Sequence, residues 1–227
     1  KDFVANVSHE LKTPLTVLQG YLEMMQEMVE PDSPNTKAVE QMQQQTHRMR
    51  SMVEQLLVLS RIEDAREISL DVTVNMAHMM DVLREEAEVL SMGEHALIFH
   101  CEDNCHLYGN ELELRSACSN LISNAIRYTQ AEGKIEVSWR KTVSGAVFSV
   151  TDTGEGIAPQ HIGRLTERFY RVDSARTRQK GGTGLGLAIT KHALSHHQSE
   201  LMITSELDKG STFSFIIPNA LIEHKSH

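Results

Sequence analysis

The stretch from Phe3 to Leu15 reads Phe-Val-Ala-Asn-Val-Ser-His-Glu-Leu-Lys-Thr-Pro-Leu, and the rest of the chain is organised around it. His9, Glu10 and Thr13 lie off the apolar stripe of this segment, so an imidazole, a carboxylate and a hydroxyl face outward together. Pro14 removes a backbone donor in mid-helix, and we expect a bend just after this cluster. The stripe has the three- and four-residue spacings of one long helix and consists of Val4, Val7, Leu11, Leu15, Leu18, Leu22, Met25 and Val29.

The composition is that of an ordinary globular protein with an acidic balance. The 227 residues include 22 Lys and Arg against 31 Asp and Glu, a net charge of −9, which argues against nonspecific nucleic-acid binding. Three cysteines are typical of a reducing compartment rather than a disulfide framework. Apolar runs are too short for a membrane span, and no signal peptide is visible. Because the chain begins inside helical periodicity without Met, we interpret it as a piece of a longer protein.

A second amphipathic helix is predicted from Pro34 to about Asp64, since Pro is favourable at the first helical position and apolar residues again recur at spacings of three and four. Two such helices joined by a short turn form an antiparallel hairpin. Each stripe stays partly uncovered in a single hairpin, so residues 1–64 predict a homodimeric four-helix bundle. The alternative is that both helices pack on the rest of the same chain.

Residues 65–71 are polar and turn-like, which predicts a linker between two domains. Residues 72–219 then mix helices with mostly antiparallel strands and show no βαβ rhythm. They predict an α+β sandwich with its helices on one face, followed by a tail at 220–227. Helices are expected at 76–91, 110–128 and 185–195, and strands at 72–74, 96–99, 105–108, 135–139, 146–152, 201–205 and 211–217.

The strands at 96–99 and 105–108 read as a hairpin around a turn at 102–104. His100, Cys101, Cys105 and His106 around this turn also have the residue types of a zinc site, but nothing distant supplies a further pair of ligands. We therefore favour the hairpin over a metal site.

Three features of the second domain point to a nucleotide. Asn120 and Asn124 share one helical face, and amide oxygens suit Mg²⁺. Asp152–Gly156 ends a strand in a carboxylate followed by glycines that let backbone approach a ligand closely. Gly181–Gly186 opens a helix whose free N–H groups and dipole attract phosphates. Residues 159–180 between them have six Lys and Arg against two Asp and Glu, as expected of a mobile segment that closes over a polyphosphate.

Each of these features is weak alone, and their order is the specific signal. Ser8–Leu15, Asn120–Tyr128, Asp152–Gly156, Arg168–Arg171 and Gly182–Gly186 resemble, in order and spacing, the H, N, G1, F and G2 boxes of sensor histidine kinases. More narrowly, the chain resembles the phosphate-regulon sensors of that family, which implies phosphate-starvation signalling. The resemblance implies a dimeric four-helix bundle followed by an α+β sandwich of the Bergerat ATP-binding type.

The resemblance also implies roles for the outward cluster of the first helix. His9 would accept the γ-phosphoryl group of ATP, which is reasonable because neutral imidazole is a competent nucleophile near neutral pH. Glu10 would accept its proton. Thr13 would position the water that dephosphorylates a response regulator.

In the second domain, the resemblance implies that Asn124 binds Mg²⁺ with help from Asn120, and that Asp152 accepts from the adenine amino group. The other residues implied to bind ATP are Arg127, Tyr128, Gly154, Gly156, Arg171, Gly182, Thr183, Gly184, Leu185, Gly186 and Thr212.

The implied partners are a second copy of the chain and the receiver domain of a response regulator, whose Asp takes the phosphoryl group from His9. No nucleic acid is expected. The implied location is cytoplasmic, with contact to an inner membrane only through segments that precede residue 1. Two alternatives stay open: a dimeric ATP-binding scaffold without phosphoryl transfer, and a Bergerat-fold ATPase that hydrolyses ATP without phosphorylating itself.

Overall fold

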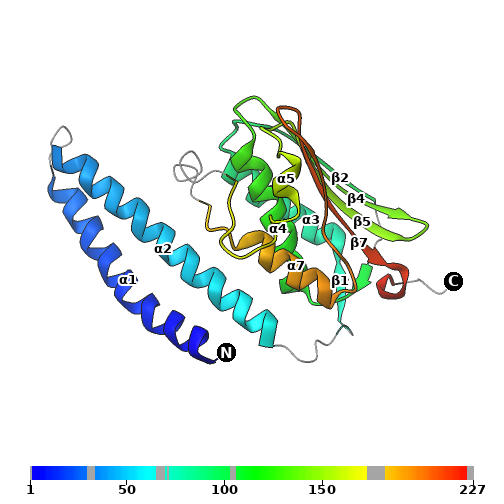
Figure 1. Cartoon of the computed structure of the whole chain (residues 1–227), viewed down its shortest axis with the longest axis horizontal. Coiled ribbons are helices and arrows are strands. Elements are labelled where there is room, and N and C mark those ends of the chain that lie inside the picture. The colour runs from blue at the N-terminus through cyan, green and yellow to red at the C-terminus, as the bar shows by residue number, and fades with distance from the viewer. Residues whose placement is uncertain are drawn as a thin grey trace.

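The computed structural model describes residues 2–29, 34–64, 70, 72–102, 106–172 and 182–223, with the backbone alone at residues 2–10, 34 and 64. The first part is a hairpin of α1 (Asp2–Met28) and α2 (Pro34–Asp64), which lie antiparallel side by side (Figure 1). The predicted helical hairpin is confirmed. Among the described helices, none combines the length and the apolarity needed to cross a membrane.

The apolar stripe of α1 divides into two faces. Leu15 and Leu22 are 7% exposed and pack toward α2, whereas Leu11, Leu18 and Met25 are 45%, 49% and 44% exposed. The exposed residues recur every seven positions, the spacing of a helix-packing seam. A single hairpin therefore leaves one apolar face of α1 uncovered.

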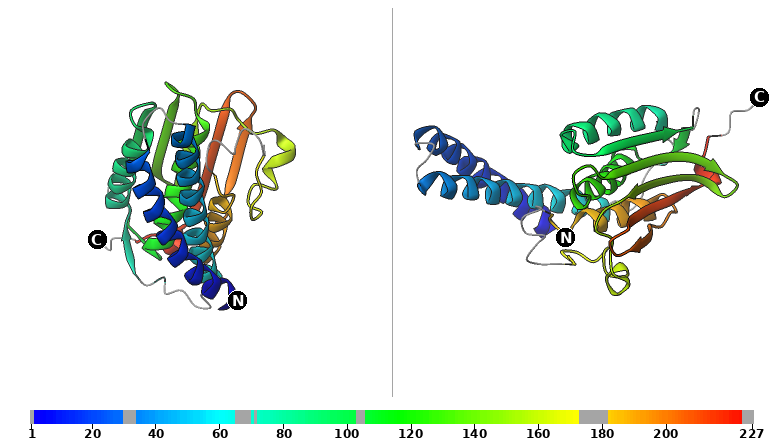
Figure 2. Two further views of the ribbon diagram at one scale, coloured as in Figure 1. Left: turned by 90° about the vertical axis from the view of Figure 1, so that its left-hand side faces the viewer. Right: turned by 90° about the horizontal axis from the view of Figure 1, so that it is seen from above.

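The second part is the predicted α+β sandwich, and it is confirmed. A five-stranded sheet has the order β2-β4-β5-β7-β6, and α3, α4 and α7 cover one of its faces (Figure 2, right). Its elements are β1 (Thr73–Asn75), α3 (Met76–Ser91), β2 (Ala96–Cys101), β3 (His106–Tyr108), α4 (Glu111–Tyr128), β4 (Lys134–Thr142), β5 (Gly145–Asp152), α5 (Pro159–Ile162), α7 (Gly186–His196), β6 (Met202–Glu206), β7 (Gly210–Pro218) and the 3₁₀ turn η1 (Asn219–Leu221).

One predicted pairing is wrong. β2 and β3 do not form a hairpin with each other, because β3 pairs antiparallel with β1 in a small separate sheet. β2 instead pairs parallel with β4, beginning with Ala96 opposite Lys134. Parallel neighbours need a crossover connection, and here α4 provides it, so the expected absence of a βαβ arrangement is also wrong at this point.

The domain boundaries differ in part from expectation. Most of the predicted linker, residues 65–69 and 71, lies outside the described residues. At the other end, the predicted tail begins too early, because Leu221 and Ile222 are buried in the main core. Ile222 also forms a β-bridge with Leu107. The packed domain therefore continues past residue 219.

α7 is joined to α4 near both ends of α7. The His197 ring at the C-terminus of α7 is fully buried, and its Nε2 accepts from the N–H of Asn110, the N-cap of α4, at 2.9 Å. Its Nδ1 lies 2.7 Å from the Ala193 carbonyl, which makes Nδ1 the protonated nitrogen. At the N-terminus of α7, Asn120 Nδ2 from the middle of α4 donates to the Gly186 carbonyl at 3.2 Å. These bonds set the position of α7 against α4. They also position the glycine loop, residues 182–185, which leads into α7.

Candidate active site

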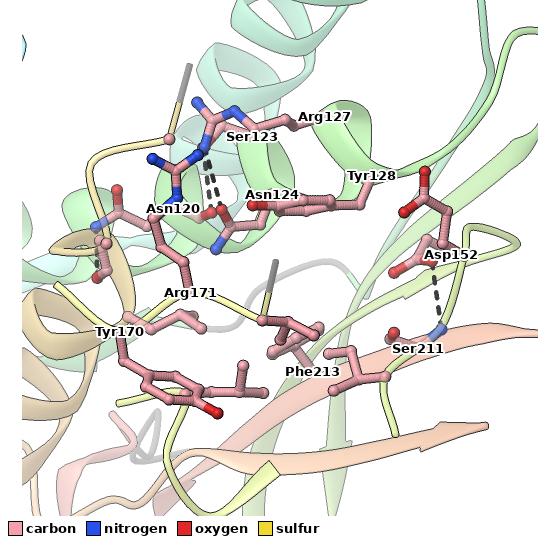
Figure 3. Close-up of a pocket in the computed structure, with 18 of the residues that line it drawn as sticks. Asn120, Ser123, Asn124, Arg127, Tyr128, Asp152, Tyr170, Arg171, Ser211 and Phe213 are labelled. Atoms are coloured by element: carbon pink, nitrogen blue, oxygen red, sulfur yellow. Dashed lines mark hydrogen bonds between the residues drawn. The ribbon is translucent and has the colours of Figure 1, made fainter. Parts of the chain in front are cut away.

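A cavity of about 500 Å³ lies where α4, the ends of β5 and β7, the loop after α5 and the loop before α7 meet (Figure 3). Its size is that of a typical small-molecule site. Several sequence segments far apart in the chain contribute to it. The predicted site residues that line it are Asn120, Asn124, Arg127, Tyr128, Asp152, Gly156, Arg171, Gly182, Thr183, Gly184 and Gly186.

One end of the cavity carries amides and guanidinium groups. Arg127 Nη1 donates to Asn124 Oδ1 at a long 3.4 Å, and the Arg171 side chain reaches toward the same two residues and Asn120 (Figure 3). All three α4 residues share one face because they are three or four positions apart. Two guanidinium groups beside amide oxygens suit a ligand with anionic oxygens and a bound cation.

The opposite end carries a buried carboxylate. Asp152 is 6% exposed, and its Oδ1 accepts from the N–H of Gly154 at 2.8 Å and of Ser211 at 3.3 Å. Burial raises the pKa of Asp152 above its ordinary value, and these two N–H donors partly counter that rise. Both bonds fall on Oδ1 among the described residues, so Oδ2 is available to accept a hydrogen bond from a ligand.

The glycine loop before α7 requires glycine for steric reasons. Gly184 has φ +75°, and a Cβ there would lie 2.8 Å from the Phe169 backbone, whose N–H donates to the Gly184 carbonyl at 2.8 Å. α7 starts at Gly186, and its N-cap Leu185 provides no side-chain hydrogen bond to the first turn. The first N–H groups of α7 therefore remain available as donors for an anion.

Three predicted residues do not line the cavity. The Thr212 hydroxyl lies 3.0 Å from that of Thr151 instead, while its neighbours Ser211 and Phe213 line the cavity. Leu185 is fully buried against α2. Gly154 acts through its backbone, since a Cβ there would lie 2.5 Å from the Tyr128 carbonyl.

The first-helix cluster lies apart from the cavity. α1, which carries His9, Glu10 and Thr13, lies on the far side of α2 from the second domain in Figure 1, and Thr13 does not line the cavity. Thr13 is exposed as predicted. The side chains of His9 and Glu10 lie outside the described residues, as do residues 173–180 of the predicted basic segment.

Sequence reasoning missed several residues of the cavity wall. Ser51 and Gln55 reach it from α2, and no local pattern distinguishes them from other polar positions of an amphipathic helix. Tyr170 also lines it, with its hydroxyl 2.7 Å from His161 Nδ1 and its ring under the Arg164 guanidinium at 4.2 Å. Tyr170 lies within the Arg168–Arg171 motif, from which no role for it is predicted.

Two family models match the chain: the His Kinase A (phospho-acceptor) domain at residues 1–65, and the Histidine kinase-, DNA gyrase B-, and HSP90-like ATPase at residues 109–221. The Phosphate regulon sensor protein PhoR of Pseudomonas aeruginosa is 48% identical over 216 residues, which cover 94% of this chain and 49% of that protein. PhoR of Haemophilus influenzae is 43% identical over 225 residues, which cover 99% of this chain and 53% of that protein.

The chain thus spans about half the length of these curated relatives. Among solved structures, full-length ShkA in complex with AMPPNP aligns with a TM-score of 0.75 at 25% identity, over 96% of this chain and 45% of that one.

Proposed function

The chain belongs to the sensor histidine kinases, and from this premise we propose that it is the catalytic core of a two-component sensor that transfers the γ-phosphoryl group of ATP to His9. The observation that carries the proposal is the cavity, which gathers an acceptor, amides, guanidinium groups and a helix N-terminus from distant segments. Phosphotransfer to an Asp of a response regulator follows in the proposed sequence.

The two ends of the cavity fit the two ends of ATP. Asp152 Oδ2 accepts from the adenine amino group, and the Tyr128 ring lines the base region. Arg127, Arg171 and the N–H groups of the loop at Gly182–Gly186 neutralise phosphate charge. An acceptor at one end and donors at the other orient the nucleotide in a single direction.

The α4 amides also fit a magnesium ion. Arg127 donates a long bond to Asn124 Oδ1, and Asn120 uses Nδ2 for the Gly186 carbonyl, so both side-chain oxygens can serve as hard ligands. Mg²⁺ would supply charge neutralisation between the phosphates. We assign its binding to Asn124, with Asn120 beside it.

In the proposed reaction, an imidazole nitrogen of His9 forms a bond to the γ-phosphorus while the bond to the bridging oxygen breaks and ADP leaves. Glu10, one position along the helix, takes the imidazole proton. In the conformation described here α2 stands between α1 and the cavity of the same chain (Figure 1). Transfer therefore requires the second domain to move along the hairpin, or to face the α1 of a partner protomer.

The remaining assignments concern partners and the reverse reaction. The exposed residues Leu11, Leu18 and Met25 support a homodimer through the hairpin. Thr13 is exposed one turn from His9, where it can orient a water for dephosphorylation of the response regulator. The PhoR relatives, whose name is that of a phosphate regulon sensor protein, support a role in phosphate signalling, and we propose a cytoplasmic location for this part of the sensor.

Incubation with γ-labelled ATP and Mg²⁺ tests the proposal, comparing wild type with His9→Gln and Asn124→Asp. We expect acid-labile, base-stable label on wild type and none on either variant. Nucleotide binding without label on wild type would favour the signalling scaffold. Steady phosphate release without a phosphoprotein would favour the ATPase.

A further inference from the structure

Helix α2 contacts the second domain as well as α1, and the contact has an apolar centre. Leu59 and Ile62 of α2 are 2% and 5% exposed, and they pack with Leu185 and Ile189 at the start of α7. Together they form a small core separate from that of the second domain. The glycine loop is therefore held directly against the hairpin.

A charged contact lies beside this core. Glu63 at the end of α2 forms an ion pair with the Arg168 guanidinium, and its carboxylate lies 3.2 Å from His192 Nε2. Arg168 precedes Phe169, whose N–H donates a hydrogen bond to the Gly184 carbonyl. One carboxylate of the hairpin thus anchors both the segment after α5 and helix α7.

The third contact reaches the cavity itself. The Thr183 hydroxyl, in the glycine loop, donates to Gln55 Oε1 of α2, and both residues line the cavity. The same hydroxyl accepts from the Leu185 N–H at 3.3 Å. A threonine hydroxyl has one proton to donate, and this contact uses it.

Phosphate oxygens at neutral pH accept hydrogen bonds readily, and so does the carbonyl oxygen of Gln55. Both therefore compete for the single proton of Thr183 if the phosphates lie at the glycine loop, as the proposed function has it. We propose that one face of α2 is a docking surface for the ATP-binding domain, formed by Gln55, Leu59, Ile62 and Glu63. The phosphates of ATP release the domain from this surface by accepting the Thr183 hydrogen bond in place of Gln55.

This arrangement links the nucleotide to the position of the domain. Docking weakens ATP binding, and by linkage ATP weakens docking by the same factor. Adenosine has no phosphates and leaves the Thr183–Gln55 contact in place. A nucleotide whose phosphates reach the loop therefore shifts the domain toward the released state, and when that nucleotide is ATP the released domain has a phosphoryl group to transfer.

Calorimetric titration of the full chain with ATP and with adenosine tests the proposal. Gln55→Met keeps a helix-forming side chain of similar length and removes the competing acceptor. We expect about fivefold tighter ATP binding, the equivalent of one net hydrogen bond, and unchanged adenosine binding. The matched control is Glu54→Gln, because Glu54 is the next residue of α2 and pairs on the surface with Arg50 at 3.1 Å. It should leave both affinities unchanged.

A second variant, Glu63→Gln, separates a local effect from docking. Glu63 does not line the cavity, so it acts on ATP affinity through the contact between the hairpin and the second domain and not by touching the ligand. We expect tighter ATP binding here too. Unchanged ATP affinity in Glu63→Gln would overturn the docking surface.

The proposal also fails if Gln55→Met binds ATP no better than wild type, and weaker binding would mean that the Gln55 amide assists the ligand. A wild-type chain that binds no ATP would instead refute the proposed function, and the docking proposal with it.

Discussion

Asp152→Asn changes one end of the cavity while keeping the contacts that hold the fold. Asn keeps an Oδ1 that can accept from the N–H groups of Gly154 and Ser211, at 2.8 and 3.3 Å in the parent structure. It replaces Oδ2 with an NH₂ group. The Oδ2 acceptor that we assign to the adenine amino group therefore becomes an NH₂ donor. This donor would face the amino group of adenine, which is also a donor.

The size of the effect follows from the charge and burial of this carboxylate. A hydrogen bond to a charged group contributes about 1.5–3 kcal/mol, so ATP affinity should fall by roughly ten- to 150-fold. The free energy of unfolding of the Asp152→Asn variant should rise at neutral pH. Burial raises the pKa of Asp152, so the stability linked to this group is present at acid pH and lost as the pH rises through that raised pKa. At neutral pH the uncharged Asn avoids that loss.

The assay combines calorimetric titration with urea denaturation at neutral pH. Guanine carries a carbonyl where adenine carries the amino group, so the Asn NH₂ can donate to GTP and the preference for ATP over GTP should narrow. Asp81→Asn is the control, because Asp81 is an exposed carboxylate of α3 that pairs with Arg84 at 3.4 Å. Unchanged ATP affinity would refute the assignment of the base, and a joint loss of affinity and stability would mean that Asp152 is needed for the fold rather than for the ligand.

Two further predictions concern the helices. His197→Ala leaves the Asn110 N–H without its acceptor and opens a cavity, so the free energy of unfolding should fall by about 2–4 kcal/mol in urea titrations. Burial lowers the pKa of His197 below its ordinary value of about 6.5. The contribution of His197 to wild-type stability is therefore present above pH about 6.5 and declines as the pH falls below it. A variant whose stability depended on pH as that of wild type does would contradict this expectation. Leu18→Glu places a charge on the exposed face of α1 and should raise the dimer dissociation constant at least about a hundredfold in sedimentation experiments, whereas an unchanged constant would locate the dimer contact elsewhere.

Local patterns in the sequence were sufficient for the secondary structure. The helix predicted at 110–128 is α4, which begins at Glu111, one residue after its N-cap Asn110, and the helix predicted at 76–91 agrees with α3 at both ends. Capping residues and a 3.6-residue period determine such segments within a few neighbours. The same local logic placed Asn120 and Asn124 on one face.

Pairings across long sequence distances had no comparable signal. β2 pairs with β4 beyond α4, so its nearest strand in sequence, β3, was a misleading guide. Gln55 meets Thr183 across 128 positions, and its place on α2 is indistinguishable from that of any solvated glutamine. The Thr212 assignment came from a motif alone, and the two-residue alternation of the strand turns its side chain toward Thr151 rather than the cavity.

The crossover between β2 and β4 has a consequence for how the domain opens. Amide hydrogens of an edge strand usually exchange with solvent early, because one side of the strand has no neighbour. β2 is such an edge, yet the chain that leads from it into β4 runs through α4, the helix that carries Asn120 and Asn124. A ligand that restricts the motion of α4 therefore also restrains β2 at the edge of the sheet. We expect nucleotide binding to slow solvent exchange at the backbone amides of β2, although no ligand atom approaches them.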